Sequence, residues 1–369
     1  MRTLYFLVPG TTSKFGGGGL WAELKTVNLA RQICTAEIVT YRQREPDRLF
    51  LADLLARRDA DECIFVVSWG FDVPKLVAQL GNRKTIYHAH STGYGFNLPP
   101  QIPIVAVSRN TMGYWGGRSP NALIYYLPNQ IGDEFCHRDK PRDIDVLVQV
   151  RKSSEYLLEQ LVPALQQHCR VELLTGFVED IAELFNRSKI YLYDSAQYWG
   201  VSGVSEGFGL PPLEALACGC QVFSSVNSGL ADYLDPGFNC HKIAGFDRQY
   251  DVERILAVLN SPDRPLLPES FFEPYREENL VRRLRVILTE INTFFDRRGE
   301  FESPIAGLSR WRLRKLWMMR SLAKVRKKLN KIGYSGYQSV EVQSFWFSGM
   351  GNGHFDRLSN QEWGMGNRK

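Results

Sequence analysis

Short apolar runs alternate with amphipathic stretches along the first 300 residues of the chain. Runs of this length, bounded by Gly, Pro, Asn or Asp, are typical of buried parallel strands. The stretches between them carry apolar residues at three- and four-residue steps, which is typical of helices packed on a sheet. In the first half we expect strands at 3–8, 37–41, 63–67, 85–90, 104–108 and 123–127, and helices at 20–30, 48–58 and 73–80.

A second series of the same kind follows a charged segment at 137–143, which is the best linker candidate. Its expected strands are 145–150, 171–174, 190–193 and 221–224, and its expected helices are 156–168, 178–186, 211–217 and 250–259. Two such series predict an α/β protein with two Rossmann-like, doubly wound domains, at 1–137 and 144–274. In such sheets ligands bind beyond the carboxyl ends of the strands, so we expect a ligand in the interdomain cleft.

The pattern of residues 275–369 differs from the two series. Residues 275–298 have apolar side chains at helical spacing and predict a closing helix that packs on the body, with the stripe Leu280, Leu284, Ile287, Ile291 and Phe294. We expect a basic extension at 300–344 and a glycine-containing flexible tail at 345–369.

Length and composition agree with this organisation. The chain has 369 residues, of which 44% are hydrophobic and 23% charged, so it is a globular protein with more than one core. It contains no uncharged apolar run long enough to span a membrane, and its N-terminus lacks the pattern of a signal peptide. The seven cysteines are scattered and form no Cys-x-x-Cys pair, which predicts a cytoplasmic protein.

Residues 205–219, Ser-Glu-Gly-Phe-Gly-Leu-Pro-Pro-Leu-Glu-Ala-Leu-Ala-Cys-Gly, are the most informative segment for chemistry. Glu206 lies in a glycine-containing loop, and Glu214 lies eight positions later near the start of a helix. Two prolines fit the first helical turn, whose free amides would face an anionic ligand. A pair of carboxylates that only stabilises the helix dipole would explain the charges. It would not explain the flanking Gly-Phe-Gly-Leu-Pro.

This segment resembles the donor-site motif of retaining GT-B glycosyltransferases of family 4, nearly residue for residue from Glu206 to Gly219. Weaker similarities follow the family's order along the chain. They are the glycine run at 16–19, His90 in Tyr-His-Ala-His-Ser-Thr, and Pro128-Asn129 before the linker. The resemblance covers residues 1–295 and implies transfer of a sugar from a nucleotide diphosphate donor with retention at the anomeric carbon.

The resemblance also implies roles for individual residues. Glu206 would contact the sugar and stabilise an oxocarbenium-like transition state, His90 would hydrogen-bond the sugar, and Glu214 would hold the ribose. The amides of Phe208, Gly209 and Leu210 would contact the sugar and phosphates, and the glycine run, with Gly17 and Gly18, would lie near the phosphates. A structural role for His90, and a flexible loop at the glycine run, remain alternatives; His88 is expected to be a residue of a sheet face.

Two features depart from the family pattern. The family neutralises the leaving diphosphate with an Arg and, about six positions later, a Lys. Here Arg151 fits, but Tyr156 and Leu157 stand at the lysine position, so Lys152 is the nearby substitute. An aromatic, glycine-rich insertion at 197–205 precedes Glu206, and we expect it to shape the acceptor side. Two Asp-x-Asp sequences, at 59–61 and 143–145, are attributed to chance, and we predict neither a metal site nor a cofactor.

The basic character of the chain is local. Residues 308–331 contain ten Lys or Arg and no Asp or Glu, and without them the net charge changes from +5 to −5. Tryptophans, methionines and leucines interleave with these charges in an imperfect stripe. A helix on an anionic membrane surface, a nucleic-acid-binding segment and a solvated helix on the acidic body are three explanations. We expect the first, since no nucleic-acid-binding motif accompanies the charge.

We therefore expect a metal-independent, retaining hexosyltransferase, cytoplasmic and peripheral on the membrane, whose acceptor is a glycolipid or an envelope polysaccharide. A non-catalytic protein that binds a nucleotide sugar is the main alternative, motivated by the altered phosphate clamp. A glycan phosphorylase of the same fold is a third, and it would require a pyridoxal cofactor.

Overall fold

The computed structural model describes residues 1–57, 62–245, 247–262, 265–297 and 309–331. The chain divides into two units, residues 1–306 and 307–369. The Asp-x-Asp sequence at 59–61, the parts of the expected extension at 300–308 and 332–344, and the expected tail at 345–369 lie outside the described residues.

The first sheet is parallel and has the strand order β3-β2-β1-β4-β5-β6-β7. Its strands are β1 (Leu4–Val8), β2 (Ala36–Thr40), β3 (Leu49–Phe50), β4 (Ile64–Val67), β5 (Thr85–Ala89), β6 (Ile104–Ala106) and β7 (Ile124–Tyr126). The helices are α1 (Gly18–Arg31), α2 (Leu51–Leu55), α3 (Val73–Leu80) and α4 (Arg109–Arg118), with the short 3-10 helices η1 (Ser13–Phe15) and η3 (Gly70–Asp72). Both faces of the sheet are covered: consecutive residues of β1, such as Phe6 and Leu7, enter separate cores.

The second sheet is also parallel, in the order β12-β11-β10-β8-β9. It contains β8 (Ile144–Gln149), β9 (Val171–Leu174), β10 (Ser188–Tyr193), β11 (Gln221–Ser224) and β12 (His241–Lys242). Its helices are η4 (Tyr156–Leu161, π-helical), α5 (Val162–Leu165), α6 (Ile181–Arg187), α7 (Ala196–Ser202), α8 (Leu210–Ala217), η5 (Ser228–Asp232), α9 (Arg248–Asn260), α10 (Glu269–Phe272) and η6 (Glu273–Tyr275). Two further apolar cores cover its two faces. The predicted fold class, with two Rossmann-like, doubly wound domains, is therefore confirmed.

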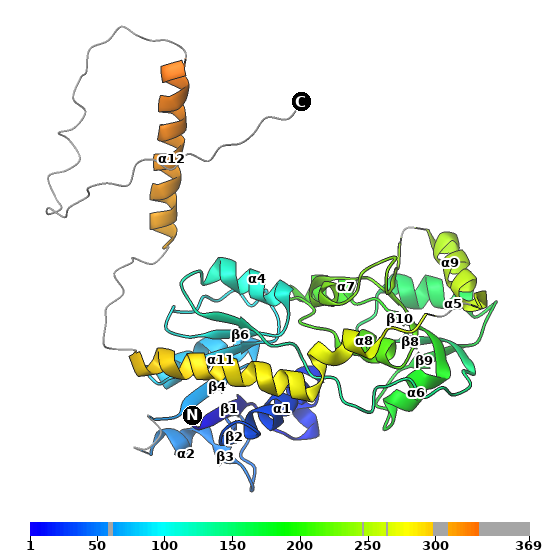
Figure 1. Ribbon diagram of the computed structural model, residues 1–369, viewed down its shortest axis with the longest axis horizontal. Coiled ribbons are helices and arrows are strands. Elements are labelled where there is room, and N and C mark those ends of the chain that lie inside the picture. Colours follow the sequence, from blue (N-terminus) through cyan, green and yellow to red (C-terminus); the bar gives the residue numbers. More distant parts are fainter. Residues whose placement is uncertain (58–61, 246, 263–264, 298–308, 332–369) are drawn as a thin grey trace, which may run out of the picture. The chain divides into compact units, whose positions relative to one another are not determined.

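Helix α11 (Glu277–Arg297) carries the chain back from the second sheet to the first. Its apolar stripe, including Leu284 and Ile291, is buried in the core that α1 and β1 also form, and Figure 1 shows α11 beside α1. At the end of α11, Arg2 donates hydrogen bonds to Asn292 and pairs with Asp296. The two ends of residues 1–297 therefore pack together.

The smaller unit contains the helix α12 (Arg310–Lys331). Its large apolar side chains are exposed: Trp311 is 78% and Trp317 is 70% accessible. Among the described residues, no helix combines the length and apolar character needed to cross a bilayer.

Candidate functional site

A cavity of about 370 Å³ lies where loops of the two sheets meet. The first sheet contributes the residues that follow β5 and the start of α1, and the second contributes those that follow β8 and β10. In the second sheet β8 and β10 are neighbours on either side of the point where the strand order reverses, which is where doubly wound sheets bind ligands. The lining residues include Gly18, Gly19, His90, Asn129, Arg151, Lys152, Trp199, Glu206, Phe208, Gly209 and Leu210.

Glu206 is buried at the wall of this cavity, and three donors hold one of its carboxylate oxygens. Oε2 accepts hydrogen bonds from Tyr193 Oη at 2.7 Å, Trp199 Nε1 at 2.7 Å and Ser195 Oγ at 3.2 Å. Tyr193 ends β10, and Trp199 lies on α7, so the strand and the insertion both fix the carboxylate. A side chain held in this way is oriented before any ligand arrives.

Close backbone packing places the loop that carries Glu206. A Cβ on Gly207 would lie 1.6 Å from the carbonyl oxygen of His90, so only glycine fits there. Ser91 Oγ donates a hydrogen bond to Ser205 O at 2.6 Å, and Thr92 Oγ1 donates one to Ser205 Oγ at 2.9 Å. These contacts join the two domains directly beside the cavity.

Helix α8 begins at the cavity. Gly209 precedes it with φ of +77°, a conformation that favours glycine, and prolines occupy the next two positions after Leu210. Because prolines have no N–H, the amides of Gly209 and Leu210 are the donors available at this end of the helix. The start of α8 therefore suits an anionic group.

Glu214 lies on α8 but is not among the residues that line the cavity. Burial raises the pKa of its carboxyl to about 7; Lys25 of α1 opposes the shift, and Glu134 adds to it. Gly17 likewise caps α1 next to the lining residue Gly18, without lining the cavity itself. Eight of the ten predicted site residues therefore line the cavity. Gly17 and Glu214 do not line it, although each lies in the same segment as a lining residue.

Arg151 and Lys152 follow β8 and supply positive charge to the cavity. Arg151 is exposed, whereas Lys152 is half-buried, and its Nζ lies 4.3 Å from the centre of the Trp199 ring. Burial lowers the pKa of Lys152, and nearby Glu206 opposes the shift. Lys152 has φ of +71°, a left-handed conformation that costs about 1 kcal/mol in a non-glycine residue.

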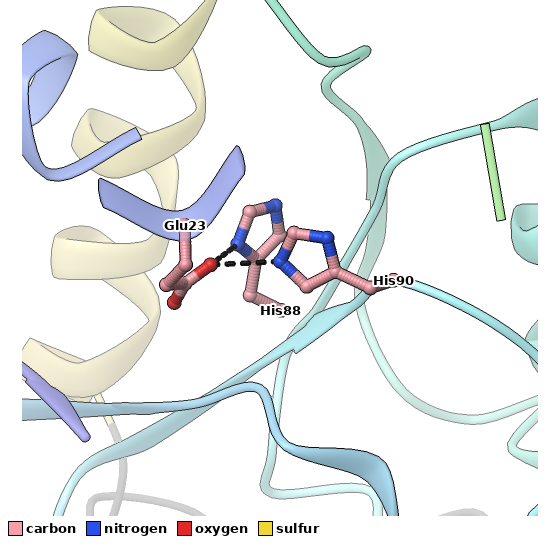
Figure 2. Close-up of side chains that lie close together, drawn as sticks. All are labelled: Glu23, His88 and His90. Atoms are coloured by element: carbon pink, nitrogen blue, oxygen red, sulfur yellow. Dashed lines mark hydrogen bonds and ion pairs between the residues drawn. The ribbon is translucent and has the colours of Figure 1, made fainter. Parts of the chain in front are cut away.

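On the other wall, His90 and His88 share a buried carboxylate that sequence analysis missed (Figure 2). Glu23 Oε2 lies 2.5 Å from His88 Nδ1 and 2.8 Å from His90 Nε2. The three ligand atoms lie close enough together to hold a metal ion, and hydrogen bonds also join them. The alternation of histidines in a strand, which puts both on one face, was the available signal. No signal in the sequence pointed to Glu23 as their partner, because it lies on α1, 65 residues before His88.

Trp199, Tyr193 and Ser195 were also not singled out, although the insertion that contains Trp199 was. The Asp-x-Asp sequence at 143–145 lies at the start of β8: Asp143 pairs with Arg170 and Arg187, and Asp145 pairs with Lys189. These carboxylates therefore have structural partners away from the cavity.

Comparison with known proteins identifies related sequences and folds. Residues 152–267 match the family model of glycosyl transferases group 1. The serotype-specific mannosyltransferase WbdA of Escherichia coli is 28% identical over 115 residues, which is 30% of this chain. The match spans only 12% of the relative's length.

Solved structures share the fold over most of the chain. A glycosyltransferase from Rickettsia africae has a TM-score of 0.58 at 13% identity and covers 79% of this chain and 98% of its own. Sucrose-phosphate synthase from Thermosynechococcus elongatus has a TM-score of 0.56 at 13% identity, covering 79% and 100%. Anabaena HepE, in a complex with UDP and glucose, has a TM-score of 0.51 at 15% identity, covering 81% and 99%. These similarities support the GT-B architecture.

Proposed function

From a GT-B fold whose second domain carries a segment of the glycosyl transferases group 1 family, we propose that this protein transfers a hexose from a nucleotide diphosphate donor. The observation that carries the proposal is the buried carboxylate of Glu206. Three side-chain donors hold it at the wall of a cavity where the loops of two parallel sheets meet. A rigid carboxylate beside free helix amides and two basic side chains provides for both a sugar and its diphosphate leaving group.

The positive end of the site would bind the diphosphate. Arg151 and Lys152 would neutralise the charge that develops as the sugar leaves, and the amides of Gly209 and Leu210 would donate hydrogen bonds to phosphate oxygens. Gly17 and Gly18 would let the backbone at the start of α1 approach the phosphates closely, because they carry no side chain. This clamp consists of side chains and amides, so we propose that transfer needs neither a metal ion nor a cofactor.

The opposite part of the cavity would hold the sugar. Glu206 would accept hydrogen bonds from sugar hydroxyls and oppose the positive charge of an oxocarbenium-like transition state, with Phe208 beside it and His90 on the other wall. Glu214, one turn into α8, would accept hydrogen bonds from the ribose diol. We propose that the new bond forms on the face that the leaving group vacates, which retains the anomeric configuration.

We propose that the acceptor is a glycolipid or an envelope polysaccharide at an anionic membrane surface on the cytoplasmic side. The support is α12, where exposed tryptophans interleave with the ten basic residues of 308–331. Each Lys or Arg near an anionic surface contributes about 1 kcal/mol. The mannosyltransferase relative makes a mannosyl donor the first to test.

A donor-hydrolysis assay on the full-length protein tests the enzymatic proposal. A panel of UDP-, GDP- and dTDP-linked hexoses is offered, and we expect turnover of one of them. Glu206→Gln should reduce turnover about 100-fold or more, whereas Glu159→Gln, an exposed glutamate of η4, should leave it unchanged. Binding of a nucleotide sugar without turnover by the unaltered protein would instead favour the non-catalytic alternative.

Two further measurements test the finer parts. The anomeric configuration of the product, determined by proton NMR, should equal that of the donor, and inversion would refute retention. Flotation with vesicles rich in phosphatidylglycerol should recover the full chain but not a chain lacking residues 308–331. Equal recovery of both chains, or equal binding to neutral vesicles, would refute the membrane surface as the partner of α12.

A further inference from the structure

The carboxylate of Glu23 connects two histidines beneath the cavity. Glu23 comes from α1, His88 lies in β5, and His90 follows the end of that strand. Figure 2 shows both rings turned toward the same carboxylate, and both hydrogen bonds end on Oε2. The side chains of Glu23 and His88 are 2% and 3% exposed.

The charge state of Glu23 determines which hydrogen atoms the rings carry. Burial raises the pKa of Glu23. Charge interactions and hydrogen bonds with His88 and His90 outweigh this effect and hold the pKa well below its usual range. An ionised carboxylate only accepts hydrogen bonds, so His90 Nε2 and His88 Nδ1 must both carry a hydrogen and donate it. Burial lowers the pKa of His90, with His88 adding to the shift and Glu23 opposing it, and the net shift favours the neutral ring.

A neutral imidazole with its hydrogen on Nε2 has a lone pair on Nδ1. His90 therefore presents an acceptor on the ring atom that Glu23 does not engage. Of the three side chains, His90 is the one that lines the cavity, and its side chain is 15% exposed. The packing of Gly207 against the His90 carbonyl fixes the backbone at the same point.

We propose that Glu23 is a positioning residue that fixes the tautomer of His90, so that Nδ1 accepts a hydrogen bond from a hydroxyl of the transferred sugar. The identity of the ligand rests on the proposed function, whereas the tautomer does not. Glu23 acts through His90 without touching the sugar. The arrangement selects a hydroxyl, which can donate, over a carbonyl or ether oxygen at that position of the ligand.

The tautomer is measured by two-dimensional ¹H–¹⁵N NMR on full-length protein labelled at histidine. The chain has six histidines, and the signal of His90 is assigned with His90→Gln. We expect the unaltered protein to show His90 protonated on Nε2 and unprotonated on Nδ1. Protonation on Nδ1, or averaging between the tautomers, would overturn the proposal. So would loss of the Nε2 hydrogen because a metal ion occupies the cluster, which elemental analysis of the same sample detects.

Glu23→Gln provides the perturbation. A glutamine amide can donate as well as accept, so we expect His90 in this variant to shift toward the Nδ1-protonated tautomer. His88→Asn is the matched control: its amide can still donate to Glu23 from near the Nδ1 position, so His90 should keep the tautomer of the unaltered protein. An unchanged His90 tautomer in Glu23→Gln would overturn the proposal. If Glu23→Gln fails to fold, the spectrum of the unaltered protein still decides it.

Kinetics separates positioning from a merely structural role. Loss of one hydrogen bond to the sugar should lower kcat/KM for the donor about 10- to 100-fold in Glu23→Gln. Affinity for UDP or GDP alone, measured by calorimetry, should stay within twofold. In His90→Gln, which lacks the Nδ1 acceptor, adding Glu23→Gln should have little further effect, because both changes remove the same interaction. A further tenfold loss in the double variant would overturn the proposal.

The two levels of the argument fail in different ways. If no nucleotide sugar is bound or turned over by the unaltered protein, the proposed function fails, while the NMR result still reports whether Glu23 sets the tautomer. If transfer is found but His90→Gln is fully active, the proposed function stands and the acceptor role of His90 is refuted.

Discussion

Glu214→Gln is the substitution whose effect on stability follows most directly from the structure. The folded protein raises the pKa of this carboxyl from 4.5 to about 7, because the side chain is removed from water and Glu134 adds negative charge nearby. The folded state therefore keeps the proton up to about pH 7, while the unfolded chain releases it near 4.5. Stability from this group is complete below pH 4.5 and is lost progressively as the pH rises toward 7.

The expected magnitude follows from the pKa difference. Each tenfold change in an equilibrium constant corresponds to about 1.4 kcal/mol, so ionising Glu214 in the folded state costs about 3 kcal/mol as an upper bound. Partial exposure of the side chain admits water and reduces the cost, so we expect about 1 to 3 kcal/mol. A glutamine has nearly the same shape and cannot ionise, so Glu214→Gln should be more stable than the unaltered protein above pH 7 and no more stable at pH 4.5.

Thermal unfolding of the ligand-free protein at pH 5 and pH 8 measures this effect. We expect the variant to unfold roughly 3 to 8 °C higher than the unaltered protein at pH 8, with most of the difference gone at pH 5. Glu159→Gln is the control, since Glu159 is exposed. A difference between variant and unaltered protein that is equal at both pH values would refute the assignment of a raised pKa to Glu214.

Three other substitutions test the contact between the domains at Gly207, the hydrogen bonding of Glu206, and the packing of the second domain around Arg142. Gly207→Ala places a Cβ 1.6 Å from the His90 carbonyl, so transfer should fall more than about 100-fold; near-normal rates would show that this contact is absent in the active enzyme. Trp199→Phe removes a donor to Glu206 and should lower kcat about tenfold with unchanged UDP affinity; a change in affinity alone would contradict this role. Arg142→Met removes hydrogen bonds to three backbone carbonyls of the second domain and should lower the free energy of unfolding by about 2 to 4 kcal/mol in urea titrations; a loss below about 1 kcal/mol would refute this structural role.

The strands of both sheets, except the two-residue β3 and β12, could be predicted from the sequence because buried parallel strands are continuous apolar runs. The expected strands at 171–174 and 221–224 match β9 and β11, and the others differ from β1, β2, β4 to β8 and β10 by one or two residues at their ends. The domain boundaries remain predictions. The expected stripe of α11 differs at one position, since Phe295 is buried and Phe294 is partly so.

Elements with weak or mixed patterns were missed. The expected helix at 48–58 is in part the edge strand β3, where Leu49 and Phe50 pair with β2, followed by the short α2. Helix α4 was not predicted, because its sequence contains three glycines and no apolar stripe, although the buried Trp115 anchors it. The N-cap Ser108, whose side chain accepts from the Thr111 amide, was the local signal for its start.

The site was predictable where a contiguous motif defines it and unpredictable where partners are distant in sequence. The motif gave Glu206 and the start of α8, and the weaker similarities to the family gave Arg151 and His90. The donors that hold Glu206 and the carboxylate beneath His90 depend on which strand and helix ends meet, and no spacing in one sequence encodes that. Lys152 could be named as a substitute, but its packing over Trp199 required coordinates.

Several energetically unfavourable features lie at or near the candidate cavity. Lys152 combines a left-handed backbone with a partly desolvated ammonium. Ionisation of the buried Glu214 carboxyl destabilises the folded state. Glu23 Oε1 and His88 Nε2 are buried without a hydrogen-bond partner among the described residues. Each of these features costs stability. Lys152 lines the cavity, and Glu23 and His88 lie against its lining residue His90. Comparable features also occur elsewhere: Tyr87 Oη and Arg2 Nε are buried without a hydrogen-bond partner among the described residues, and Asp139 has a left-handed backbone. Because mutation readily removes groups that destabilise a fold, the presence of the strained, partly desolvated Lys152 at the cavity is explained if an anionic ligand there supplies the interactions that its ammonium lacks.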